Sequence, residues 1–280
     1  MIGARGQLWS RCTAWLVTCG LMMAMTGCSR SPEAEADAVQ QLKALGVLTI
    51  KDNNTGFVKV VNLSTLDDPA KTADAVKFAA QLVQPASATF NNLTLSPEDL
   101  AAIGSMKTLN ELNLTETNVD DAGVQKLSGL KKLGTLYLVG TKITDNSLNT
   151  ISGFKELKVL GLGRTGLTGS FAPLNGLKKL NWIEISEMKL SDDLLKSLGQ
   201  LPALQTVTML DSEHNPKIID ELKATNNKLQ FDIVRGSLGG GREEPEEGGA
   251  AEAGGKAEVG GTAEDEGKAA SPAAAEASGK

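Results

Sequence analysis

Leu109-Asn-Glu-Leu-Asn-Leu114 is the first of five consecutive segments that share one apolar pattern. The others are Leu133-Gly-Thr-Leu-Tyr-Leu138, Leu157-Lys-Val-Leu-Gly-Leu162, Leu180-Asn-Trp-Ile-Glu-Ile185 and Leu204-Gln-Thr-Val-Thr-Met209. Successive segments begin 24, 24, 23 and 24 residues apart. The alternation at the end of each segment predicts a strand, and a fixed period of this length predicts a solenoid of stacked coils.

The pattern L-x-x-L-x-L at this period resembles the bacterial leucine-rich-repeat proteins of the cell envelope, over about residues 37–235. The resemblance implies an α/β leucine-rich repeat solenoid. Such a fold is a right-handed horseshoe arc with a parallel sheet on its concave face and helices or 3-10 turns on its convex face. It also implies a role in protein interaction.

The ladder of strands is expected to begin earlier, with the segment Val58–Leu63, and to continue with Phe90–Leu95. Only 19 residues separate Phe90 from Leu109, so this coil is expected to lack a five-residue turn between strand and helix.

Polar residues recur at fixed places after the strands. Threonine hydroxyls are expected to hold the turns, and recurrent aspartates are expected to cap the helices that follow. Met188 takes the threonine place in one coil and cannot form such a bond, and Gly169 shortens another coil, which we expect to be extended or 3-10. The threonines are Thr117, Thr141 and Thr165, and the aspartates are Asp121, Asp145 and Asp192.

Both ends of the repeat array look capped, as a solenoid requires because its terminal coils have one uncovered side. Residues 37–63 are assigned to an N-terminal cap, with a helix over 32–45 and a hairpin over 48–63. Residues 58–212 form the repeats. Residues 213–235 form a C-terminal cap, with a helix over 216–224 and a strand over 229–234.

Residues 1–27 have the features of a signal peptide, with Arg5 and Arg11 before a short apolar run. Met25-Thr-Gly-Cys28 resembles a bacterial lipoprotein signal, which implies cleavage before Cys28, lipidation of Cys28 and a short tether over 28–36. Because Ser29 follows the cysteine, the resemblance favours an outer-membrane lipoprotein in the cell envelope. The alternative is an ordinary secretory leader on a secreted or periplasmic protein.

The tail, residues 236–280, is rich in Gly, Ala and Glu and holds ten acidic and four basic residues. It has too few apolar residues to form a core, so we expect disorder. The whole chain has a net charge of −6, and this lack of basic excess argues against nucleic acid as a partner.

The candidate binding site lies on the concave sheet, where residues between the leucines point outward. Tyr137, Val159 and Trp182 are expected to cluster on three successive strands, with Gly161 and Gly163 leaving a depression between Tyr137 and Glu184. The alternative is a face that carries a few aromatic residues by chance. The predicted binding residues are Glu111, Tyr137, Val159, Trp182 and Glu184.

Little in the sequence suggests catalysis. His214 is the only histidine, and with Asp211 and Glu213 it forms either a metal or acid/base site or simply a polar loop. No catalytic, metal or phosphate-binding motif occurs, so we predict no enzyme, no metal and no small-molecule cofactor. Recurrent lysines at the coil ends are interpreted as solvated edges. The predicted function is binding of a protein or peptide partner by a lipid-anchored protein, and the alternative is a spacer protein whose acidic tail makes the contacts.

Overall fold

The computed structural model describes residues 31–66 and 68–234. The predicted signal peptide, the lipidation site Cys28 and the acidic tail lie outside these residues. No helix among the described residues is long and apolar enough to cross a membrane. In chain order the elements are α2 (Pro32–Ala44), β1 (Leu48–Lys51), β2 (Val58–Asn62), η1 (Leu63–Thr65), η2 (Pro69–Lys71), α3 (Thr72–Ala79), β3 (Ser87–Thr89), α4 (Pro97–Gly104), β4 (Glu111–Asn113), α5 (Asp121–Lys126), β5 (Thr135–Tyr137), α6 (Ser147–Ile151), β6 (Val159–Gly161), η3 (Ala172–Gly176), β7 (Trp182–Glu184), α7 (Asp192–Leu198), β8 (Thr206–Leu210), α8 (Pro216–Thr225) and β9 (Gln230–Val234).

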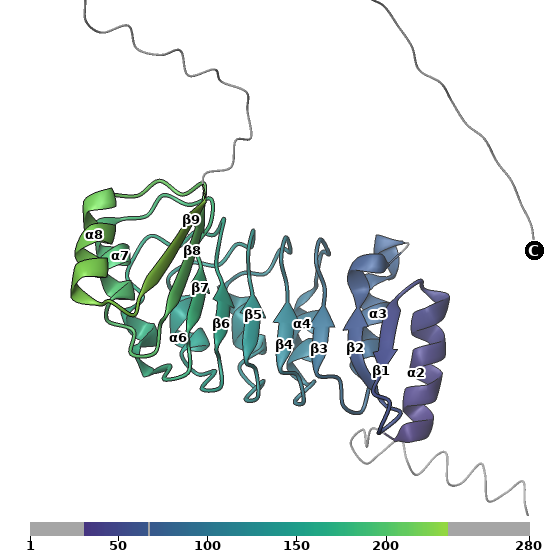
Figure 1. Cartoon of the computed structure of the whole chain (residues 1–280). Helices are drawn as coiled ribbons and strands as arrows, with labels where there is room; N and C mark the ends of the chain where they lie inside the picture. Colours follow the sequence, from purple (N-terminus) through teal and green to yellow (C-terminus); the bar gives the residue numbers. More distant parts are fainter. Residues whose placement is uncertain (1–30, 67, 235–280) are drawn as a thin grey trace, which may run out of the picture. The chain divides into compact units, whose positions relative to one another are not determined.

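Nine strands form one sheet in which spatial order follows chain order from β1 to β9 (Figure 1). The first pair, β1 and β2, is an antiparallel hairpin, and every later pair is parallel. The helices and 3-10 turns that connect the parallel strands lie behind the sheet (Figure 1). One strand per coil with the return on the other side is the predicted leucine-rich repeat solenoid, which the structure confirms.

The core is built from the leucine positions of the pattern. Each middle apolar residue pairs with the middle apolar residue of the next strand, so the buried side chains of successive coils stack. All of them are fully buried in one continuous cluster. Truncating such a leucine to alanine costs about 2–5 kcal/mol. The paired middle residues from β4 to β8 are Leu112, Leu136, Leu160, Ile183 and Val207.

The predicted second strand, Phe90–Leu95, is wrong by five residues. The strand is β3, in which Ala88 pairs with Leu112, so Phe90 fills the last apolar place of the pattern. Pro85 then fills the first place, 24 residues before Leu109. The coil therefore has the regular length, and the five-residue turn that was expected to be missing is present. Leu93 and Leu95 belong to the turn that follows, where later coils have Thr117 and Val119.

The predicted capping role of the repeated aspartates is also wrong. The α5 helix is capped by the preceding residue, Asp120, which accepts from Gly123 N at 2.8 Å. Asp121 instead reaches into the next coil, where its carboxylate accepts from Thr144 N at 2.8 Å, from Thr144 Oγ1 at 2.6 Å and from the Ser147 hydroxyl.

Asp145 and Asp192 behave as Asp121 does, since the carboxylate of each accepts hydrogen bonds from the next coil. Asp145 accepts from Thr168 N and from Gly169 N, and Asp192 accepts from Asn215 Nδ2. The α7 helix is capped by Ser191, whose hydroxyl accepts from Leu194 N. The aspartates therefore connect coils instead of starting helices.

The threonine positions behave as predicted, because Thr117, Thr141 and Thr165 each donate to the carbonyl oxygen three residues earlier. Met188 leaves the corresponding carbonyl, that of Ile185, without such a donor. Ser212 from the next coil supplies it, at 2.8 Å from its hydroxyl to Ile185 O. The shortened coil that holds Gly169 returns through the 3-10 helix η3, as expected.

The N-terminal end is closed by α2, which begins at Pro32, so residues 32–36 of the predicted tether are helical. Ser31 caps this helix and Pro32 suits its first position. Glu35, in the first turn, is buried, and its two carboxylate oxygens accept from Val58 N and Val83 N, both at 2.7 Å. Because Val58 begins β2, the start of α2 lies at the edge of the sheet where the parallel strands begin.

Between β2 and β3 the apolar spacing of the sequence predicts a helix over 70–83, with Val76, Ala80 and Val83 pointing inward. The helix found there, α3, lies at this same end and stops earlier, at Ala79. Val76 is fully buried, whereas Ala80 and Val83 are only half-buried and Leu82 fills the core. At the other end, α8 and β9 cover the last coil, with β9 parallel to β8.

Candidate functional site

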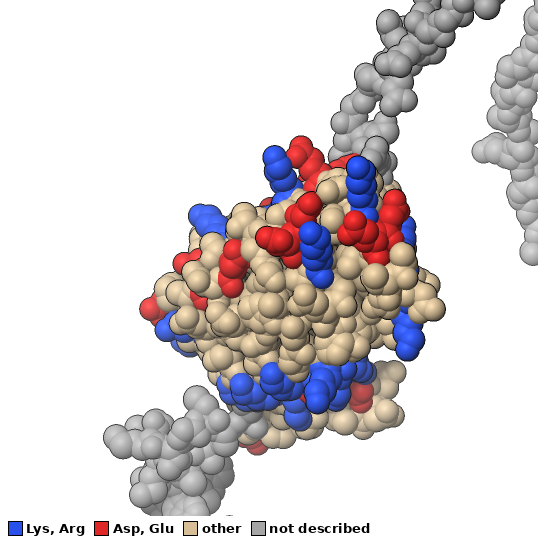
Figure 2. Space-filling model, turned by 90° about the vertical axis from the view of Figure 1, so that its left-hand side faces the viewer, with Lys and Arg blue, Asp and Glu red and all other residues tan. Residues whose placement is uncertain are grey.

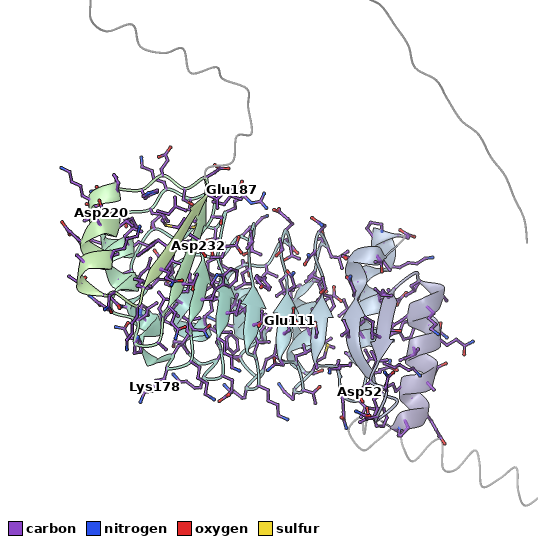
Figure 3. The ribbon with its side chains drawn as sticks, in the orientation of Figure 1. Asp52, Glu111, Lys178, Glu187, Asp220 and Asp232 are labelled. Atoms are coloured by element: carbon purple, nitrogen blue, oxygen red, sulfur yellow. The ribbon has the colours of Figure 1, made fainter. Side chains whose placement is uncertain are left out.

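The residues between the apolar positions form two columns on the face of the sheet that points away from the helices, here called the open face. The pairing of the strands places the predicted site residues as the sequence pattern predicts, since Glu111, Thr135, Val159 and Trp182 lie in one column. Tyr137, Gly161 and Glu184 lie in the other. Figure 3 shows Glu111 over β4 and Asp232 over β9, at two places along this face.

An aromatic pair lies at the centre of the open face. The rings of Tyr137, on β5, and Trp182, on β7, have centroids 6.3 Å apart and meet edge-on at 73°. Gly161 lies between them on β6, and a Cβ atom at this position would be only 2.7 Å from Tyr137 Cδ1. Glycine at 161 thus lets the tyrosine ring lie across the neighbouring strand and meet the tryptophan. An edge-on pair of this kind contributes about 0.5–1.5 kcal/mol beyond its buried area.

The predicted depression at Gly161 and Gly163 is wrong, because both glycines are buried. The Tyr137 ring covers Gly161, and a Cβ atom on Gly163 would meet the backbone oxygen of Ser186 at 2.8 Å. The two glycines therefore allow close packing, within the face at 161 and between coils at 163. The site is a half-buried aromatic surface and not a hollow.

The surroundings of the pair are acidic. Burial raises the pKa of Tyr137, and the nearby carboxylates of Glu111 and Glu184 raise it further because they disfavour a tyrosinate. Trp182 is held by a hydrogen bond from Nε1 to Thr208 Oγ1 at 3.0 Å. The structure therefore brings all five predicted residues to one face, with Val159 half-buried between the strands that carry the rings.

Two neighbours of the site were missed by the sequence reasoning. Thr208 holds the indole ring of Trp182 through its hydrogen bond. Val139 lies beside Gly161, since a Cβ atom on Gly161 would be 3.3 Å from Val139 Cγ2. Val139 follows the last leucine of its strand, so continuing the outward alternation by one step would have identified it.

A charged row at the edge where the parallel strands end was also missed. Arg164 forms ion pairs with Glu116 and, at 3.6 Å, with Glu187. All three have φ near +50° to +58°, which costs a residue with a side chain about 1 kcal/mol or more. In the coil between those of Glu116 and Arg164, the corresponding residue is Gly140, and a Cβ atom on it would be 2.6 Å from Glu116 Oε1. The glutamate thus passes over a glycine to reach the arginine.

No family model matches the chain, and no curated protein sequence matches it. Among solved structures, it is similar to internalin C2 from Listeria monocytogenes (21% identity, 73% of this chain, 86% of that chain, TM-score 0.47). It is also similar to a leucine-rich-repeat protein from Leptospira interrogans (24% identity, 55% and 38% covered, TM-score 0.45). A third is the plant peptide hormone receptor RGFR1 in complex with RGF2 (20% identity, 68% and 36% covered, TM-score 0.40).

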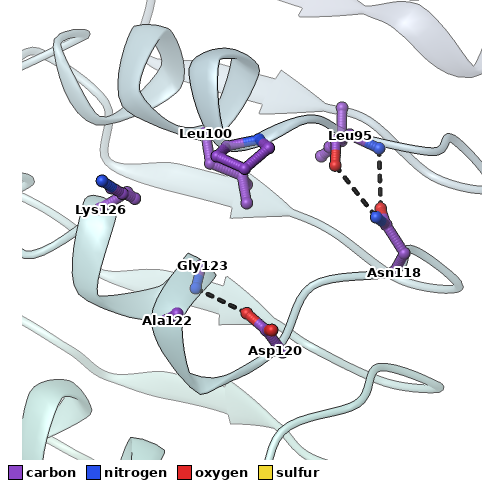
Figure 4. A pocket seen from close by; sticks show the side chains of 8 residues that line it. Leu95, Leu100, Asn118, Asp120, Ala122, Gly123 and Lys126 are labelled. Atoms are coloured by element: carbon purple, nitrogen blue, oxygen red, sulfur yellow. Dashed lines mark hydrogen bonds between the residues drawn. The ribbon is translucent and has the colours of Figure 1, made fainter.

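Other parts of the surface have a structural explanation. A hollow between the α4 and α5 coils is lined by Leu100 and Lys126, and Asn118 and Asp120, which also line it, form hydrogen bonds within the chain (Figure 4). Asn118 bonds both the N–H and the carbonyl of Leu95, and Asp120 caps α5. The hydrogen bonds of Asn118 and Asp120 therefore have a structural role, in joining two coils and in starting a helix.

Within the described residues, the His214 loop included, no group of three or more His, Cys, Asp or Glu side chains is placed to hold a metal ion. The Nδ1 atom of His214 lies 2.8 Å from the carbonyl oxygen of Ser212.

Proposed function

We propose that the protein is a lipid-anchored, non-enzymatic binding protein of the cell envelope that holds a protein or peptide segment on its open face. The observation that carries the proposal is the Tyr137–Trp182 pair, which is half-exposed and flanked by Glu111 and Glu184. Tyrosine and tryptophan are enriched at binding hot spots.

The chemistry of the face favours a partner segment with a basic side chain. Arginine and lysine are attracted to the faces of aromatic rings and pair with carboxylates. The face offers both groups together, over strands about 4.8 Å apart. A segment that crosses the strands would meet Glu111 on β4, the rings on β5 and β7, and Glu184 beside Trp182.

The anchor and the location rest on the leader sequence and the position of Cys28. The binding role rests on the open face itself.

The test is capture of partners from envelope extracts by the full chain, compared with a Trp182→Ala/Tyr137→Ala version. We expect the double substitution to abolish capture of the specific partner. A matched control is Thr89→Ala/Gln230→Ala, which changes the same two columns at the outer strands β3 and β9. Unchanged capture by the aromatic variant, with circular dichroism showing that it is folded, would refute the site.

Deleting residues 236–280 separates this proposal from a role of the acidic tail. If the open face binds the partner, capture survives the deletion, and if the tail makes the contacts, capture is lost.

A further inference from the structure

Seven lysines lie at the edge of the sheet where the parallel strands begin. Each is within four residues of the start of β4, β5, β6 or β7, in the loop that leads from the returning segment into the strand. This group, here called the lysine edge, consists of Lys107, Lys131, Lys132, Lys155, Lys158, Lys178 and Lys179.

The lysine edge is strongly positive. The four loops that carry it, residues 104–110, 127–134, 151–158 and 175–181, hold one acidic residue, Glu156, so their net charge is +6. The opposite edge mixes both signs, and Figure 2 shows basic residues gathered along the lower edge and acidic and basic residues together along the upper one. Figure 3 places Lys178 at the lower edge and Glu187 at the upper one.

Internal pairing explains only part of this charge. Lys179 pairs with Glu156 at 2.6 Å, and Lys107 and Lys155 donate to the carbonyls of Gly104 and Ser152 at the ends of helices. Within the described residues, four of the lysines have neither a hydrogen bond nor an ion pair from their side chain, and all four are exposed. They are Lys131, Lys132, Lys158 and Lys178.

The chain enters the fold at this same edge. Glu35 in the first turn of α2 bonds Val58 N, at the start of β2, and Val83 N, shortly before β3. Ser31, which caps α2, is therefore on the side of the sheet that carries the lysine edge, and Cys28 is three residues before it in the sequence.

We propose that the lysine edge docks on the surface of an anionic phospholipid membrane. Its charges form an exposed row over four coils, about 15 Å long at the strand spacing, which suits a flat charged surface better than a small ligand. A lysine near such a surface contributes about fivefold in affinity, from roughly 1 kcal/mol each. Docking of this edge requires no lipid on Cys28, but a lipid there would add to it, because stable anchoring takes two signals.

The experiment measures binding of the full chain to vesicles of neutral phosphatidylcholine, with and without added phosphatidylglycerol, at about 0.1 M salt. One variant is Lys131→Gln/Lys132→Gln/Lys178→Gln. The matched control is Lys142→Gln/Lys189→Gln/Lys217→Gln, which removes the same charge from exposed residues at the opposite edge. All versions carry the same leader, so binding to neutral vesicles measures the contribution of the leader to membrane affinity.

We expect phosphatidylglycerol to strengthen binding of the native chain, and the lysine-edge variant to lose on the order of 100-fold of that affinity. The control should keep it, because the opposite edge is roughly 20 Å away, about two Debye lengths at this salt concentration.

Three results would overturn the proposal. Binding that is equally strong with and without phosphatidylglycerol would show that the anionic surface is not what the protein recognises. Equal losses of affinity in the two variants would show that only the net charge of the protein matters. Binding that appears only after removal of residues 236–280 would assign the lysine edge to the acidic tail of the same chain. None of these results bears on the open face, which is tested by partner capture.

Discussion

Replacing Glu35 with glutamine should destabilise the N-terminal end of the solenoid by about 2–3 kcal/mol. The carboxylate is only 4% exposed and accepts from two backbone N–H groups, Val58 N and Val83 N, both at 2.7 Å. A hydrogen bond to a charged group contributes about 1.5–3 kcal/mol, and a buried N–H without a partner costs a similar amount. Glutamine keeps one acceptor oxygen but turns an NH₂ donor toward the other N–H. One of the two bonds is therefore lost and one donor is left unsatisfied.

Urea unfolding followed by circular dichroism measures the loss, and amide hydrogen exchange at Val58 and Val83 locates it. Because coils contact mainly their neighbours, exchange should accelerate at this end first. Glu33→Gln is the matched control, since Glu33 is exposed in the same helical turn and the substitution removes the same charge. It should change stability by less than about 0.5 kcal/mol. Equal effects of the two substitutions would show that the paired carboxylate does not hold the coils together.

Three further predictions concern single residues. Tyr137 is the only tyrosine in the chain, so tyrosinate absorbance reports it alone, and Glu184→Gln should lower its raised pKa toward 10 by removing a nearby negative charge. Burial opposes ionisation of Asp121, but the hydrogen bonds from Ser147 and Thr144 outweigh it and lower its pKa. Its carboxylate therefore stabilises the fold above the unfolded pKa of about 3.9 and loses this effect as the pH falls below that value, so Asp121→Ala should reduce stability at neutral pH and approach the native chain in acid unfolding experiments. Gly161→Ala should displace the Tyr137 ring, cost about 1–3 kcal/mol and change the near-ultraviolet circular dichroism of the aromatic pair.

The open-face columns were predictable because a strand alternates with a period of two, so fixing one leucine fixes every outward neighbour. The strand β3 was not predictable in this way, because small or cyclic residues occupy positions where the repeat pattern has leucine. Pro85 and Ala88 fill places where other coils have leucine, while Phe90, Leu93 and Leu95 imitate the same spacing five residues later. Apolar spacing alone cannot choose between two registers that both fit it.

The errors at the aspartates and the glycines have a different cause. Asp120 and Asp121 are adjacent residues of one type, and only the position of the next coil shows that the first caps a helix and the second bridges to Thr144. Likewise, a glycine beside Tyr137 predicts free space, but the ring lies over Gly161 and fills it. Both outcomes depend on contacts between coils, which the sequence of one coil does not contain.

The two proposed surfaces lie on the same coils, and this constrains how they work together. Lys131 and Lys132 precede β5 and Lys178 precedes β7, the strands that carry Tyr137 and Trp182. Five residues separate Lys132 from Tyr137, so an edge docked on a membrane would hold the aromatic pair within roughly 17 Å of it. The open face would then stand upright on the surface, because the lysines lie at its edge and not on it. A partner segment crossing the strands would run along the membrane. Vesicle-bound protein should therefore capture its partner at least as well as free protein, whereas capture blocked by vesicles would mean that the open face itself is turned toward the lipid.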